Sequence, residues 1–79
     1  MTSLKEVNIS IDHMNECEVK LTYAFQCFYD MSKNPNNNLN SIDSDKITCD
    51  LEESIIMIQN AIQVAQSIKR RMEKNNAKV

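Results

Sequence analysis

The segment from Leu51 to Met72 constrains the fold more than any other part of the chain. It contains neither Gly nor Pro, is rich in Ile, and is long enough for about six turns of α-helix. Apolar residues recur in it at spacings of three, four and seven, as on one face of an amphipathic helix. They are Leu51, Ile55, Ile58, Ile62, Ala65 and Met72. We therefore expect one long helix in the second half of the chain.

A second apolar row runs beside the first one. Its members are Met57, Ala61, Val64 and Ile68. Together the two rows cover an arc of roughly 180°, whereas a helix that packs against one partner helix needs a stripe of only about 100°. The chain offers this helix a single neighbour, so the second row predicts a surface that binds another molecule.

The first half of the chain has the same three-four spacing, which predicts a helix over about residues 3–33. Its apolar row is Leu4, Val7, Ile11, Met14, Leu21, Phe25 and Phe28, with Glu18 at the position where the repeat would place another member. Ser3 and Glu6 match the capping box that starts many helices. The alternation of Val7, Ile9 and Ile11 leaves an extended start over residues 4–11 open, although a lone strand would have nothing to pair with.

The expected core of the hairpin joins residues from both helices. It comprises Leu21, Phe25 and Phe28 from the first helix and Leu51, Ile55, Ile58 and Ile62 from the second. We expect Leu21 and the two aromatic rings to form its thickest part. If Phe25 is fully buried, replacing it with Ala should cost about 3–5 kcal/mol.

The connection between the helices is expected over about residues 34–43. Pro35 lacks a backbone N–H and restrains Asn34 from helical angles, and the neighbouring asparagines suit a turn in a chain without Gly. Asp43 or Ser44 is expected to cap a second helix over about residues 44–74. The prediction is a single all-α domain over residues 1–79, folded as an antiparallel two-helix hairpin (αα-hairpin) that can assemble into a larger helical bundle with a partner.

Composition narrows the classes of function. The 79 residues carry a net charge of −2, which argues against a strongly basic nucleic-acid binder. The sequence holds neither an apolar run of membrane-spanning length nor the pattern of a signal peptide, so we expect a cytoplasmic protein that does not enter membranes. The lysines and arginines at 69–71 and 74 are expected to be a solvated helix end that complements the helix dipole.

The residue types that carry chemistry do not form a recognisable site. Cys17, Cys27 and Cys49 are odd in number and lack the C-x-x-C spacing, so we expect reduced cysteines that act as small apolar side chains. His13 and Cys17 are four residues apart, but two ligands fall short of the four in a structural zinc site. We therefore expect no metal, no cofactor and no enzymatic activity.

The chain resembles a family of small helical hairpins, the co-chaperones of the needle subunit of bacterial type III secretion systems (the YscE, SsaE and EscE group). The resemblance rests on the opening residues 1–6, the polar turn at 34–40, and the segment Leu51-Glu52-Glu53-Ser54-Ile55-Ile56-Met57-Ile58. The cysteines and the asparagine-rich turn depart from the family. The resemblance implies docking on a TPR-like chaperone, with which the hairpin keeps the needle subunit soluble and unpolymerised. Met57, Ala61, Val64 and Ile68 would then contact the partner.

Two other functions stay open at the level of the sequence. The surplus row would equally suit a homodimer, in which two hairpins make a four-helix bundle and act as a regulator. A small phage or plasmid inhibitor also needs only a shaped surface and leaves no motif. The choice between a hetero-complex and a homodimer is therefore left to the structure and to experiment.

Overall fold

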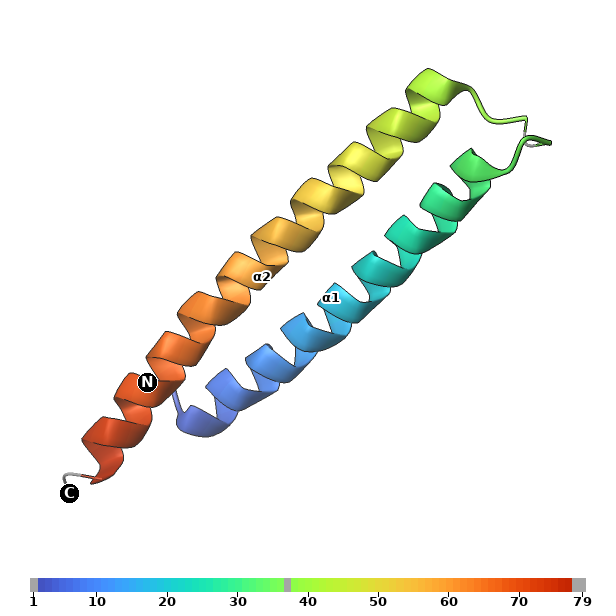
Figure 1. The fold of residues 1–79 in the computed structure, drawn as a ribbon. Coiled ribbons are helices and arrows are strands. Elements are labelled where there is room, and N and C mark those ends of the chain that lie inside the picture. Colours follow the sequence, from blue (N-terminus) through green and yellow to red (C-terminus); the bar gives the residue numbers. More distant parts are fainter. Residues whose placement is uncertain (1, 37, 78–79) are drawn as a thin grey trace.

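The computed structural model describes residues 2–36 and 38–77, which form two long helices joined by a short connection (Figure 1). Helix α1 spans Leu4–Lys33 and helix α2 spans Ser41–Ala77. The helices lie side by side and run in opposite directions, in a rod with dimensions of 63 × 17 × 15 Å. The predicted all-α antiparallel two-helix hairpin is therefore confirmed.

The start of α1 follows from its capping residue. Ser3 has extended backbone angles, and its hydroxyl accepts a hydrogen bond from the backbone N–H of Glu6 at 3.2 Å. The same hydroxyl lies 3.3 Å from the Glu6 carboxylate, to which it donates. Because the cap holds the first turn, the helix begins at Leu4, and residues 4–11 are helical rather than extended.

Asparagine side chains shape the connection between the helices. The backbone N–H of Asn34 donates to the carbonyl of Met31 at 3.2 Å and closes the last turn of α1. Asn34 itself is extended, as expected for the residue before a proline, and its side-chain oxygen accepts from the N–H of Asn36 at 3.0 Å. The chain therefore leaves the helix at the predicted position.

Helix α2 begins at Ser41, ahead of the predicted start at residue 44, and the expected cap at Asp43 or Ser44 is wrong. The side-chain oxygen of Asn40 accepts from the backbone N–H groups of Ile42 at 2.8 Å and Asp43 at 3.4 Å. Its carbonyl accepts from the N–H of Ser44 at 2.9 Å. Asn40 thus satisfies the donors of the first turn, and Ser44 lies within the helix.

The seam between the helices follows a seven-residue repeat of the kind seen in coiled coils. Its α1 members, all buried or half-buried, are Leu4, Val7, Ile11, Met14, Glu18, Leu21, Phe25, Phe28 and Ser32. Its α2 members, likewise buried or half-buried, are Ser44, Thr48, Leu51, Ile55, Ile58, Ile62, Ala65, Lys69 and Met72. Leu4 and Met72 line one depression near the chain termini, which fixes the antiparallel register of the two rows.

Among the apolar side chains of this seam, burial is greatest in the half away from the connection. Val7, Ile11 and Ile62 are only 7–9% exposed, and of these three only Ile62 belongs to the predicted core. The other predicted core residues are half-buried. These are Leu21, Phe25, Phe28, Leu51, Ile55 and Ile58. The expectation that the aromatic residues form the thickest part of the core therefore differs from the structure. A hairpin has no third layer to cover a large ring, so part of Phe25 stays at the surface, where its ring stacks on Tyr29 with centroids 6.0 Å apart.

Candidate protein-binding face

The two helices present matching flanks on one side of the seam. A depression of about 220 Å³ between them is lined by Glu6, Val7 and Ser10 of α1 and by Ala65 and Ile68 of α2. Ser10 and Ile68 therefore flank the seam on the same side. Residues seven apart occupy equivalent positions in the repeat, so residues at seven-residue intervals from Ser10 and from Ile68 also lie on this side of the seam.

The row of Ser10 continues through Cys17 and Ala24 to Met31, and the row of Ile68 continues back to Ala61. We call the apolar part of this side the apolar face. It consists of Ala24, Cys27 and Met31 of α1 and Met57, Ala61, Val64 and Ile68 of α2. The hairpin thus brings together the surplus row of the second helix and small or flexible apolar residues of the first.

The α2 half of the apolar face is exposed. Met57 is 69% exposed, Val64 59% and Ile68 38%, and Ala61 is exposed as well. None of these four side chains belongs to the seam, so their apolar character is not needed to join the helices. Their role in partner binding stays a prediction, but the structure leaves them accessible for it.

The opposite flank of the seam is polar. Its α1 row is Asn8, Asn15, Thr22 and Tyr29, and its α2 row is Asp45, Glu52, Gln59, Gln66 and Glu73. Rotation of 100° per residue places these rows on the far side of the seam from the apolar face. The rows that border the seam are therefore mostly polar on this flank and more apolar on the other one. Val19 and Ile56, at 67% and 54% exposure, add separate apolar side chains beyond the polar rows.

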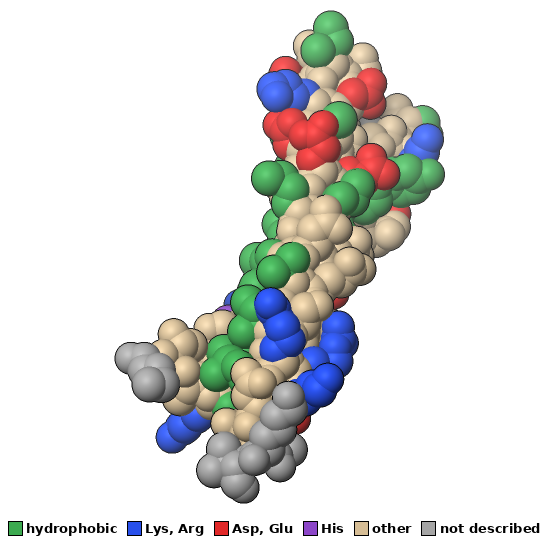
Figure 2. Space-filling model, turned by 90° about the vertical axis from the view of Figure 1, so that its left-hand side faces the viewer, with side chains coloured by type: hydrophobic (Ala, Val, Ile, Leu, Met, Phe, Trp, Pro, Cys, Tyr) green, Lys and Arg blue, Asp and Glu red, His purple; other side chains and the backbone are tan. Residues whose placement is uncertain are grey.

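Charge is divided along the length of α2. In the space-filling view, acidic side chains gather toward one end of the rod, basic side chains toward the other, and hydrophobic side chains lie between them (Figure 2). The acidic residues of the first half of the helix are Asp43, Asp45, Asp50, Glu52 and Glu53, and the basic ones of its end are Lys69, Arg70, Arg71 and Lys74. This order complements the helix dipole. Asp50 lies seven residues before Met57 and Arg71 seven residues after Val64, so these two residues give the exposed row ends of opposite charge.

One ion pair crosses a turn within the acidic half. The Lys46 ammonium donates to Oδ2 of Asp50 at 3.0 Å. This hydrogen bond, together with the charge of Asp50, raises the pKa of Lys46 above its ordinary value of 10.5. The pair is exposed, so it orients the two side chains and contributes little to stability.

The basic residues at the end of α2 do not act as one cluster. Lys69 is half-buried in the seam, whereas Arg70, Arg71 and Lys74 are exposed and line a depression with Ser67. Arg70 donates to the Ser67 hydroxyl at 3.2 Å, and Nε of Arg71 donates to the Ser67 carbonyl at 3.4 Å. The two guanidinium groups are thus held along their own helix.

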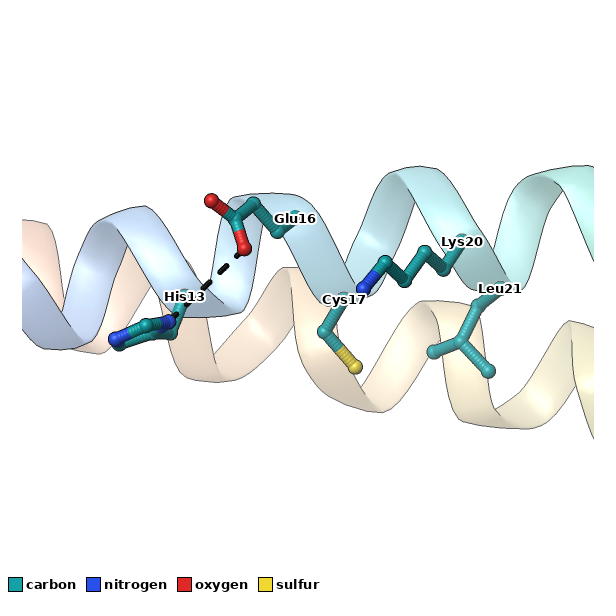
Figure 3. Close-up of a pocket in the computed structure, with 5 residues that line it drawn as sticks. All are labelled: His13, Glu16, Cys17, Lys20 and Leu21. Atoms are coloured by element: carbon teal, nitrogen blue, oxygen red, sulfur yellow. Dashed lines mark ion pairs between the residues drawn. The ribbon is translucent and has the colours of Figure 1, made fainter.

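A further depression, of about 410 Å³, lies on α1 and contains the His13–Cys17 pair noted in the sequence (Figure 3). His13 Nδ1 is 4.0 Å from the Glu16 carboxylate, and the side chains of Cys17 and Leu21 point toward α2. The side chains of His13 and Glu16 are both mostly exposed. Because a single helix lines the depression, it lacks the enclosure of a typical small-molecule site. Within residues 2–36 and 38–77, no three potential metal ligands gather.

Comparison with protein-family models, with curated proteins and with solved structures gave no match for this chain. In the part of the chain that the structure describes, neither helix is long and apolar enough to cross a membrane.

The sequence did not predict the places of two residues of α2, one in the seam and one beside it. Ser44, expected as a cap, is only 4% exposed, and its hydroxyl has no hydrogen-bond partner among the described residues. Ile47 lies on the row of Ala61 and Ile68 and is 36% exposed, with Ser54 between it and Ala61, so it adds a separate apolar side chain nearer the connection. The seven-residue spacing of both positions was the signal that could have placed them.

Proposed function

We propose that this chain is a protein-binding module that docks through its apolar face and performs no catalysis. The observation that carries the proposal is the exposed row of Met57, Ala61, Val64 and Ile68, which the hairpin does not use for its own seam. Exposed apolar rows on small proteins commonly mark interfaces. The rows that border the seam on the opposite flank are mostly polar, so we assign docking to the apolar face.

The spacing of the row suits a helical partner. Its members lie at positions i, i+4, i+7 and i+11, which are the anchors that an amphipathic helix lays into an apolar groove. Stacked helical repeats such as TPR modules form extended concave surfaces of that kind. Together with the family resemblance, this spacing supports a cytoplasmic co-chaperone that pairs with a TPR-like chaperone. The pair would hold a type III secretion needle subunit soluble and unpolymerised.

The test is a tagged pull-down from the native host that compares the wild-type chain with Val64→Asp and Gln63→Asp. Both changes add one negative charge at neighbouring exposed positions of α2, but only Val64 lies on the apolar face. We expect the wild type and Gln63→Asp to recover a TPR-type chaperone and a short needle-like subunit, and Val64→Asp to lose both. Equal recovery with all three baits, or recovery of neither protein with the wild type, would refute the proposal. Circular dichroism on each bait establishes that the hairpin stays folded.

A further inference from the structure

A row of four residues along α2 is complementary to itself when the helix is reversed. Asp50, Met57, Val64 and Arg71 follow one another at seven-residue intervals. The midpoint between Met57 and Val64 is also the midpoint between Asp50 and Arg71, and Ala61 lies next to it. If a second α2 ran antiparallel about this midpoint, Met57 would face Val64 of the second copy, and Asp50 would face its Arg71.

We propose that, in the absence of another partner, a second copy of this chain covers the apolar face through antiparallel α2–α2 pairing. This proposal rests on the proposed function, which assigns the apolar face as a binding surface. It adds that a second copy occupies this face in the free protein. A two-fold axis near Ala61 makes the contact isologous, because each helix presents the same patch to the other. Two hairpins joined in this way form a four-helix bundle.

The packing at the centre of this contact agrees with the sizes of the side chains. Ala61 is small, so the two α2 helices can approach closely at the axis. Met57 and Val64, the two apolar members of the four-residue row, are 69% and 59% exposed in the single chain, so both have apolar surface left to cover. Their seven-residue spacing keeps both in contact as the helices coil around each other.

The charges at the ends of the row select the antiparallel direction. A parallel pairing would place the acidic half of α2 against the acidic half of the second copy, and the basic ends against each other. Acidic and basic side chains of one chain gather toward opposite ends of the rod (Figure 2), so in the antiparallel direction each acidic half would meet a basic end. The Lys46 ammonium donates to Oδ2 of Asp50, and a carboxylate accepts from more than one donor, so Asp50 can also receive the Arg71 guanidinium of the second copy.

Self-pairing at this face has a consequence for the proposed function. A docking chaperone and the second copy compete for Met57 and Val64, so partner binding must separate the dimer. The dimer would then keep the apolar face covered until a partner is present.

Sedimentation equilibrium on the purified full chain tests the pairing. The expected mass is twice the 9.1 kDa of one chain. Asp50→Arg and Arg71→Asp each place like charges opposite each other, and each should weaken dimerisation by about tenfold or more. The double variant, which exchanges the two charges, should restore it. Two controls should leave the mass unchanged: Arg70→Asp, one residue away from the row, and Lys46→Ala, which removes only the intrahelical ion pair. A monomeric wild type, or a double variant that dimerises no more tightly than the single variants, overturns the inference.

Disulfide trapping tests the register independently. In a chain whose three cysteines are replaced by alanine, Ala61→Cys should form a covalent dimer under mild oxidation, and Gln63→Cys should not. Equal trapping at the two positions contradicts the two-fold axis near Ala61. The inference and the proposed function fail in distinguishable ways. A monomer that still captures the chaperone in a Val64-dependent manner refutes only the dimer, and a trapped dimer that captures no chaperone refutes only the co-chaperone.

Discussion

Ser10 of α1 and Ile68 of α2 line one depression between the helices, although they are far apart in the sequence. This relationship establishes which flank of α1 lies beside the surplus apolar row of α2. Because both helices follow a seven-residue repeat, it places Ala24 and Met31 on the same side of the hairpin as Ala61. The apolar face is thus a property of the paired helices, and neither helix forms it alone.

The seam and the apolar face should respond differently to truncation. Ile62 is 7% exposed, so Ile62→Ala should lower the free energy of unfolding by about 2–5 kcal/mol, which is enough to unfold much of the chain. Val64→Ala, two residues further along α2, should change it by less than about 0.5 kcal/mol because that side chain is exposed. Urea denaturation followed by circular dichroism measures both. Comparable losses for the two variants would place Val64 in the core.

Phe25→Ala should cost less than the about 3–5 kcal/mol of a fully buried aromatic residue, because Phe25 is half-buried. The substitution also removes the stacking of the Phe25 ring on Tyr29, so the loss of unfolding free energy should exceed that of a substitution at an exposed site. The same denaturation experiment should rank Ile62→Ala as more destabilising than Phe25→Ala. The reverse order would mean that the aromatic residues form the main part of the core after all.

The start of α2 can be tested with two alanine substitutions. Asn40→Ala removes the oxygen that caps the first turn and should cost about 0.5–2 kcal/mol. Ser44→Ala removes a buried hydroxyl that has no partner among the described residues, so it should be neutral or stabilising. Thermal unfolding of the two variants measures the difference. A larger loss at Ser44 than at Asn40 would restore Ser44 as the cap.

The Lys46–Asp50 pair predicts a specific titration. Since the folded-state pKa of Lys46 is raised, the contribution of this pair is fully present below the ordinary lysine pKa of 10.5 and is lost as pH rises through the higher folded value. The contribution of this ion pair to the free energy of unfolding should therefore not change with pH near neutrality. NMR titration of the Lys46 side chain should show its pKa fall toward the ordinary value in Asp50→Asn. An unchanged titration in that variant would mean that the ion pair is absent in solution.

The sequence predicted both helices and the antiparallel hairpin because their apolar spacing is long and regular. It also predicted that Met57 and Val64 are surplus to the seam, since the apolar arc of α2 is too wide for one neighbour. The cap was misplaced because Asn40, Asp43 and Ser44 are all good capping residues, and local sequence does not choose among them. Which seam residues are most buried depends on how their side chains pack against each other, and the spacing of apolar residues does not describe that packing.

The assignment of the apolar face as the binding surface is best tested by the solvent accessibility of methyl groups in the assembled protein. Met57 and its neighbour Ile56 are 69% and 54% exposed in the isolated hairpin, but only Met57 belongs to the apolar face. Methyl NMR with a soluble paramagnetic agent can compare the two, alone at high dilution and in the assembled state. We expect the Met57 and Val64 methyl groups to become protected on assembly, while Ile56 stays accessible. Equal protection of Met57 and Ile56, or protection of Ile56 alone, would contradict the assignment of this face as the binding surface.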